Sequence, residues 1–172
     1  MGKMTYKHAA IVLLVLRVFL FTRIASGSLR TQYMDQNGFV MVPSFLSTAN
    51  FAQVQATVTQ MRKKLKVEVG SLAVGRIGCH IPANSGIQST ILSNENLVRL
   101  SRIVGKNLEV CEHFPLELRH YPIGASMAMH KDDVLYTPAQ VEFIFTVDNE
   151  SDSQTQFIDR QGRTTGEFTL PN

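Results

Sequence analysis

The side chains best suited to chemistry in this 172-residue chain are His130 and Asp132, which one residue separates. If residues 128 to 132 are extended, side chains two positions apart point to the same face of the strand. An imidazole and a carboxylate then project together from one strand end. Such a pair supplies two of the three ligands in the facial arrangement of two histidines and one carboxylate that holds non-haem Fe(II). The alternative is a solvated surface turn in which His130 packs or caps.

The residues before this pair extend it into a longer spaced motif. Tyr121 and Gly124 form a Tyr-x-x-Gly pattern, and five residues separate Gly124 from His130. The segment resembles the Tyr-x-x-Gly-x-x-Tyr-x-x-His-x-Asp motif of the prolyl 4-hydroxylase-like branch of the 2-oxoglutarate and Fe(II)-dependent dioxygenases. The resemblance implies that Tyr121 binds 2-oxoglutarate and that His130 and Asp132 bind iron. Met127 stands where the family has its second tyrosine.

The same resemblance implies an activity and a set of cofactors. A complete enzyme of this kind is an oxidoreductase that uses Fe(II), O2 and 2-oxoglutarate to hydroxylate a residue in a peptide or protein substrate, with proline as the implied residue and ascorbate keeping the iron reduced. The resemblance covers residues 36–172, with specific motif support in residues 118–132. A weaker echo is Thr155-x-Phe157, which matches the end of the family's Gly-Gly-Glu-Thr-x-Phe segment, whereas Asp152 and Ser153 replace its glycines.

Two residues that the family needs have no counterpart in the chain. No histidine follows His130 to act as the third iron ligand, and no Lys or Arg stands where the family pairs one with the distal carboxylate of 2-oxoglutarate. Arg160 and Arg163 come too early for that position. We therefore expect a dioxygenase domain that is truncated at its C-terminus, and whether this chain is active is a separate question. The alternatives are a non-catalytic lumenal binding module with the same fold and a membrane-anchored interaction protein.

The first 27 residues have the composition of a targeting segment. Lys3 and Lys7 precede an apolar run over residues 9–21 that only Arg17 interrupts, and small residues occupy positions 25–27. This order is typical of a secretory signal peptide cleaved after Gly27. An uncleaved signal anchor over residues 9–24 is the alternative, because arginines near the ends of an apolar segment can reach the interface. Either reading predicts the secretory pathway, in the endoplasmic reticulum or Golgi lumen or outside the cell, and a cytosolic amphipathic helix is the alternative to both.

Two smaller features agree with that location. Asn149 begins an Asn-Glu-Ser glycosylation acceptor in a polar stretch. Cys79 and Cys111 are the only cysteines, and they either form one disulfide or remain free thiols. The formal net charge of +3 arises in the targeting segment, since removing its four basic residues leaves 13 basic and 14 acidic residues. That balance gives no reason to expect a nucleic-acid partner.

The remaining patterns predict two helices followed by a strand-rich half. Apolar residues spaced three and four apart predict a helix over residues 48–66 with Ser47 as its cap. A second helix is predicted with Ser93 or Asn94 as its cap and Gly105 as its stop. Strands are predicted over residues 39–43, 116–121, 141–147, 154–159 and 164–170. This order predicts an α+β fold with the helices on one side of a sheet. The family resemblance implies that the sheet is an incomplete double-stranded β-helix, or jelly roll.

Overall fold

The structure is a computed structural model that describes residues 16–22, 29, 33, 38–69, 72–111, 116–131, 133–134, 137 and 139–168. Within these ranges the helices are α2 (Thr48–Met61), α3 (Ile87–Ile91) and α4 (Asn94–Val104), with short 3₁₀ turns η2 (Arg62–Lys64) and η3 (Ala83–Ser85). The strands are β1 (Leu16–Thr22), β2 (Lys66–Val67), β3 (Ala73–Val74), β4 (Ile77–His80), β5 (Lys106–Val110), β6 (Glu117–His120), β7 (Ser126–Met127), β8 (Val141–Phe143), β9 (Gln154–Ile158) and β10 (Thr164–Phe168).

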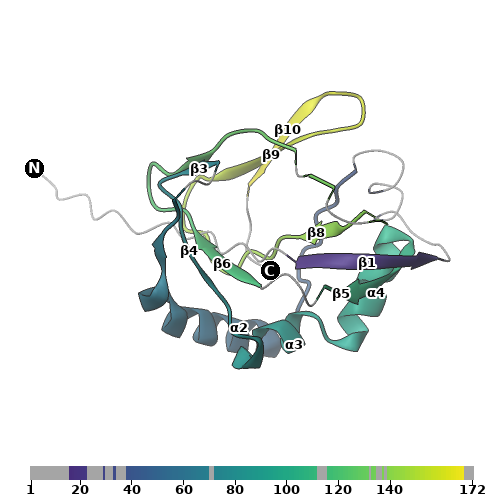
Figure 1. Cartoon of the computed structure of the whole chain (residues 1–172), viewed down its shortest axis with the longest axis horizontal. Helices are drawn as coiled ribbons and strands as arrows, with labels where there is room; N and C mark the ends of the chain where they lie inside the picture. Colours follow the sequence, from purple (N-terminus) through teal and green to yellow (C-terminus); the bar gives the residue numbers. More distant parts are fainter. Residues whose placement is uncertain are drawn as a thin grey trace, which may run out of the picture.

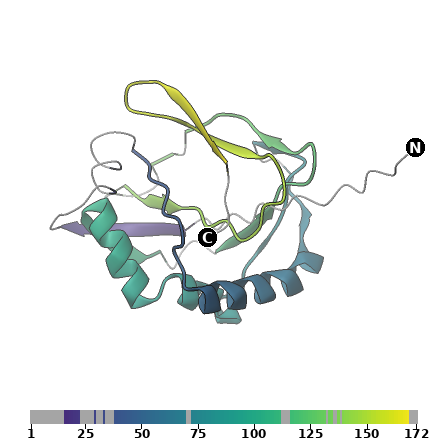
Figure 2. The same cartoon turned by 180° about the vertical axis from the view of Figure 1, so that it is seen from behind.

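All described strand pairs are antiparallel, and they form small sheets. Two sheets have three strands, in the orders β5-β1-β8 and β2-β4-β6, and two are the pairs β3-β7 and β9-β10. Figures 1 and 2 show the helices along one side of these strands and the β9-β10 hairpin on the opposite side. The mixed helix and antiparallel strand content confirms the α+β prediction, with its helices on one side.

The hydrophobic core lies between the helices and the strands. Six of its most buried members come from α2, α3 and the segment that enters and forms β6. They are Val54, Val58, Ile87, Ile91, Leu116 and Leu118. Because β6 is fixed against the helices in this way, the residue that follows it, Tyr121, starts from a well-defined position.

The predicted helix ends agree with the structure at their caps. The Oγ of Ser47 accepts a hydrogen bond from the Asn50 amide at 3.3 Å, and that of Ser93 accepts one from the Asn96 amide at the same distance. Of the two predicted caps, Ser93 and Asn94, Ser93 is therefore the cap of α4. Gly105 ends α4 in the left-handed conformation at φ 76°, which a glycine adopts without steric cost. The predicted 48–66 helix is shorter, since α2 ends at Met61 and η2 follows.

Two predicted strands differ from the structure. Residues 39–43 form no strand, and Phe39 instead stacks on Phe157 of β9 with ring centroids 3.9 Å apart. The run over residues 141–147 forms a strand only as β8, at an edge of its sheet. Phe145 and Val147 are buried while Ile144 is exposed, so the run buries one face and not both. Aromatic packing, including Phe145 against Phe51 at 6.1 Å, takes the place of ladder pairing there.

Part of the predicted targeting segment lies in a described strand. Residues 16–22 form β1, which pairs with β5 on one side and β8 on the other, whereas residues 1–15 and 23–28 lie outside the described residues. Among the helices that the structure describes, none is long and apolar enough to cross a bilayer. The signal peptide or signal anchor over residues 1–27 stays a prediction.

Candidate functional site

The spaced motif begins where β6 ends. Tyr121 directly follows β6, and a tight turn comes next, in which the Ala125 amide donates to the Pro122 carbonyl at 2.9 Å. Gly124 takes φ 82° in this turn, which is strained for any residue with a Cβ. The turn leads into β7, whose Met127 lies opposite Ala73 of β3. The Gly124 of the motif is thus explained by the reversal that carries the chain from β6 to β7.

Tyr121 points its hydroxyl into a polar cluster. The hydroxyl accepts a hydrogen bond from Nη1 of Arg76 at 3.0 Å and donates to Sδ of Met127 at 3.2 Å. The Arg76 guanidinium also lies 5.6 Å from the centroid of the tyrosine ring, within cation–π range. Met127, the departure from the family motif, therefore contacts the residue whose role the motif predicts.

Arg76 is the charged residue that the sequence did not single out for this site. It is only 4% exposed, and its Nε and Nη2 both donate to Oε2 of Glu68, at 2.8 and 2.5 Å. Burial lowers the pKa of Arg76, but its hydrogen bonds and charge interactions with Tyr121 and Glu68 together raise it above the ordinary value. The guanidinium is therefore charged, and Glu68 compensates it. No local pattern indicates this contact, because Arg76 and Tyr121 are 45 residues apart.

Two residues separate His130 from the end of β7, and its side chain is exposed. Its Nδ1 lies 3.0 Å from the carbonyl oxygen of Ala128. A hydrogen bond of this length requires the proton to be on Nδ1, and in the neutral ring the lone pair is then on Nε2. This is the tautomer in which metal-binding histidines are commonly held by a backbone carbonyl.

Asp132, the second predicted metal ligand, lies outside the described residues. The pairing of its carboxylate with the His130 imidazole therefore stays a prediction. Over the described part of the chain, no group of three or more His, Cys, Asp or Glu side chains could hold a metal ion. Of the three residues predicted from the motif, the structure thus places Tyr121 and His130.

Other candidate residues have structural roles. Arg119 on β6 forms an ion pair with Glu117, so the charges of the two polar side chains on the face of Tyr121 neutralise one another. Cys79 and Cys111 are not joined by a disulfide, and burial raises the pKa of the Cys79 thiol. This agrees with the alternative in which the two cysteines form no disulfide.

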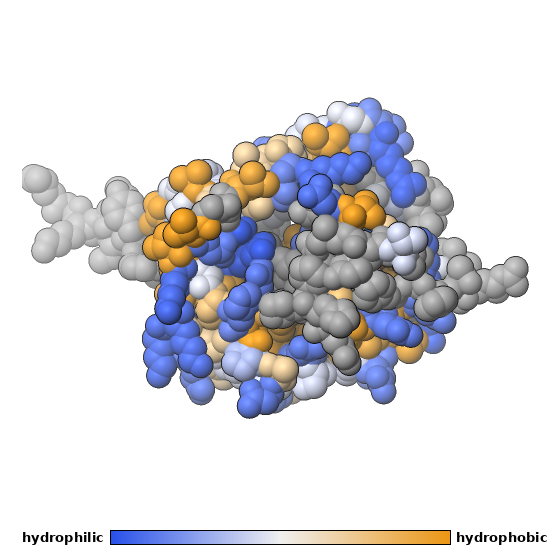
Figure 3. Space-filling view, viewed as in Figure 1, coloured by the Kyte–Doolittle hydropathy of each residue, from blue (hydrophilic) through white to orange (hydrophobic). Residues whose placement is uncertain are grey.

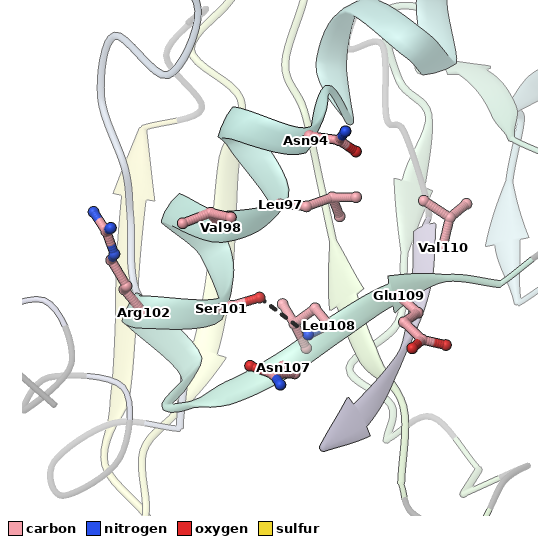
Figure 4. A pocket seen from close by; sticks show the side chains of 9 residues that line it. All are labelled: Asn94, Leu97, Val98, Ser101, Arg102, Asn107, Leu108, Glu109 and Val110. Atoms are coloured by element: carbon pink, nitrogen blue, oxygen red, sulfur yellow. Dashed lines mark hydrogen bonds between the residues drawn. The ribbon is translucent and has the colours of Figure 1, made fainter. Parts of the chain in front are cut away.

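A separate cavity of about 600 Å³ lies between α4 and β5 (Figure 4). Its lining mixes apolar and polar side chains, and Ser101 at its centre accepts a hydrogen bond from the Leu108 amide at 3.0 Å. In Figure 1 it lies at the opposite end of the molecule from β3 and β4. The lining residues are Asn94, Leu97, Val98, Ser101, Arg102, Asn107, Leu108, Glu109 and Val110. The sequence motif does not include any of them.

Comparisons of the chain with protein-family models, with curated proteins and with solved structures find no match.

Proposed function

We propose that residues 36–172 are part of a prolyl 4-hydroxylase-like dioxygenase domain with an incomplete double-stranded β-helix core. The observation that carries the proposal is the spacing of Tyr121, Gly124, His130 and Asp132. The turn at Gly124 supports it, because the conformation there gives a physical reason for the glycine of the motif. In the complete enzyme the reaction would be hydroxylation of a peptidyl residue, with proline as the residue that the resemblance implies.

The imidazole of His130 and the carboxylate of Asp132 are donors of the kinds that bind Fe(II). His130 is exposed, and its Nδ1 contact with Ala128 favours the tautomer that presents the Nε2 lone pair to a metal. Asp132 would add a carboxylate oxygen, completing two of three protein ligands. Bound iron would supply the redox chemistry between O2 and 2-oxoglutarate. Ascorbate would keep the iron reduced. Two ligands hold a metal less tightly than three, so we expect weak binding.

Tyr121 fits the predicted contact with a carboxylate of 2-oxoglutarate. Its hydroxyl proton is directed at the sulfur of Met127, which is a weak acceptor. A carboxylate oxygen in that place would form a charge-assisted and stronger hydrogen bond. The Arg76 guanidinium behind the hydroxyl would favour a negative charge there. In this role Tyr121 orients the cosubstrate and Arg76 positions Tyr121.

Metal titration tests the proposal directly. Under anaerobic conditions, isothermal titration calorimetry of the full chain should detect weak Fe(II) binding that the double variant His130→Ala, Asp132→Ala removes. His80→Ala is the matched control, because the His80 side chain is 71% exposed and stands outside the motif. Unchanged Fe(II) affinity in the double variant would rule out the metal site.

We also propose that the chain enters the secretory pathway, through a signal peptide or an anchor in residues 9–24. The sequon supports this proposal: Oδ1 of Asn149 accepts hydrogen bonds from the Ser151 amide at 3.0 Å and its hydroxyl at 2.6 Å. The asparagine and the hydroxyl that define the acceptor are thus already in contact. In a secreting host, we expect glycosidase treatment to shift the mass of the native chain and not that of Asn149→Gln. Absence of any shift would count against lumenal entry.

A further inference from the structure

Five exposed aliphatic side chains gather where the chain passes from β2 to β4 and at the turn before β7. Val69 is 94% exposed, and the other four are between 62 and 72% exposed. These residues, which we call the apolar tip, are Val67, Val69, Leu72, Val74 and Ile123. Figure 3 shows hydrophobic surface gathered over β3, with hydrophilic surface below it toward the end of α2. An exposed apolar patch on a soluble protein commonly marks an interaction site.

The apolar tip is held in place at its base. The Glu68 amide donates to the Arg76 carbonyl at 3.2 Å, and the side chains of the same two residues form the buried ion pair. Val74 lies opposite Ser126 in the β3-β7 pair, which joins the β2–β4 excursion to the turn that contains Ile123. Hydrogen bonds and strand pairing therefore hold the backbone at the base of the tip, at Glu68, Val74 and Arg76.

Positive charge flanks the apolar tip. Lys63, Lys64 and Lys66 precede Val67 directly and are all exposed. The nearest acidic residue in the sequence, Glu68, is already neutralised by Arg76. The surface beside the aliphatic side chains therefore has a net positive charge, which complements an anionic partner.

We propose that the apolar tip and the three lysines form a surface that binds anionic lipid bilayers. A side chain that is 94% exposed protrudes and lines no groove, and a bilayer interface accepts protruding aliphatic groups without a matching shape. Lysines at the rim of the apolar surface would bind the anionic headgroups while their aliphatic stems lie along the interface. A second copy of the chain fits less well, because pairing two such tips would bring two lysine clusters together. The proposal is independent of the dioxygenase proposal.

The absence of tryptophan from the chain allows a site-specific test. In Val69→Trp the only indole reports on the apolar tip, and in Val98→Trp it reports on the exposed face of α4, at the other end of the molecule. With phosphatidylcholine vesicles containing phosphatidylserine, the emission of Val69→Trp should shift to the blue and be quenched by brominated lipids. The emission of Val98→Trp should stay the same with and without vesicles. This comparison holds even if the N-terminal segment itself binds the vesicles.

The lysine contribution is measured in the Val69→Trp background. Replacing Lys63, Lys64 and Lys66 with serine should weaken vesicle binding about fivefold per lysine at low ionic strength. Pure phosphatidylcholine vesicles should bind poorly. No blue shift in Val69→Trp, an equal shift in both tryptophan variants, or equal binding to neutral and anionic vesicles would each overturn the proposal. A protein partner at this surface would give the first of these results.

Discussion

Replacing Arg76 with methionine tests the central contact of the candidate site. Methionine retains an aliphatic chain but removes the guanidinium that bonds Glu68 and Tyr121. Removing one member of a buried ion pair usually costs about 3–5 kcal/mol, because the other charge stays buried. The Glu68 side chain is 25% exposed, so water can recover part of its solvation. We therefore expect Arg76→Met to lower the free energy of unfolding by about 2–3 kcal/mol.

The matched control is an ion pair of similar length that is more exposed. Arg62 Nη2 lies 2.5 Å from Oδ2 of Asp148, but the two side chains are 38% and 31% exposed. Water screens such a pair, so Arg62→Met should cost about 1 kcal/mol or less. Urea unfolding of the wild type and both variants, followed by circular dichroism, gives the two free energies.

A double-mutant cycle with Glu68→Gln completes the measurement. If the pair is coupled as the geometry indicates, Arg76→Met with Glu68→Gln should be less destabilised than the sum of the two single variants, by about 1–3 kcal/mol. Should Arg76→Met prove no more destabilising than Arg62→Met, the guanidinium is not buried against Glu68, and the description of the cluster around Tyr121 is wrong.

Three further predictions concern the turn, the core and the hairpin. Gly124→Ala should lower the free energy of unfolding by about 1–2 kcal/mol in urea titrations, because φ is 82° and no atom lies near the added Cβ. Leu118→Ala should cost about 2–5 kcal/mol in the same titrations, since Leu118 is 1% exposed. Hydrogen bonds from the Arg163 and Gln161 amides and the Arg163 side chain hold the pKa of Asp159 below 3.8. Its stabilisation should therefore be complete above pH 3.8 and be lost as the pH falls further, and unfolding of Asp159→Asn across this range should lack that component.

The elements that could be predicted from the sequence have their signals within a few residues. Ser47 and Ser93 cap their helices through bonds to amides three residues away, and Gly105 ends α4 through its own backbone conformation. Gly162, at φ 78°, closes the turn between β9 and β10 in the same local way. Such signals determine where an element starts and stops whatever its tertiary partners are.

The elements that were missed or wrongly predicted depend on packing against residues far away in the chain. α3 has only five residues, too few for a helical period, and it forms where Ile87 and Ile91 enter the core. Residues 39–43 have the composition of a strand, but Phe39 packs against a ring of β9 instead of joining a ladder. Tertiary packing decided both cases, and β propensity depends on such packing.

The candidate site divides in the same way. The motif lies in one stretch of the chain and could therefore name Tyr121 and His130 as candidates, whose roles stay predictions. Arg76 could not be named, because β4 and β6 must first pair before it reaches the tyrosine. The structure therefore adds to the motif a buried positive charge next to the predicted contact for the cosubstrate.

The Glu68–Arg76 pair connects the two proposed surfaces. It closes the base of the apolar tip through the Glu68 amide and the Arg76 carbonyl, and it leaves Nη1 of Arg76 to hold the Tyr121 hydroxyl. Arg76→Met keeps that backbone hydrogen bond but removes the side-chain ion pair beside it, so it should release Tyr121 and weaken the support of the tip at the same time. Gly124→Ala keeps the pair and strains the turn between Tyr121 and β7, which also contains Ile123 of the tip. Comparing lipid binding and 2-oxoglutarate binding in these two variants would show whether the two surfaces are coupled through the ion pair or through the turn.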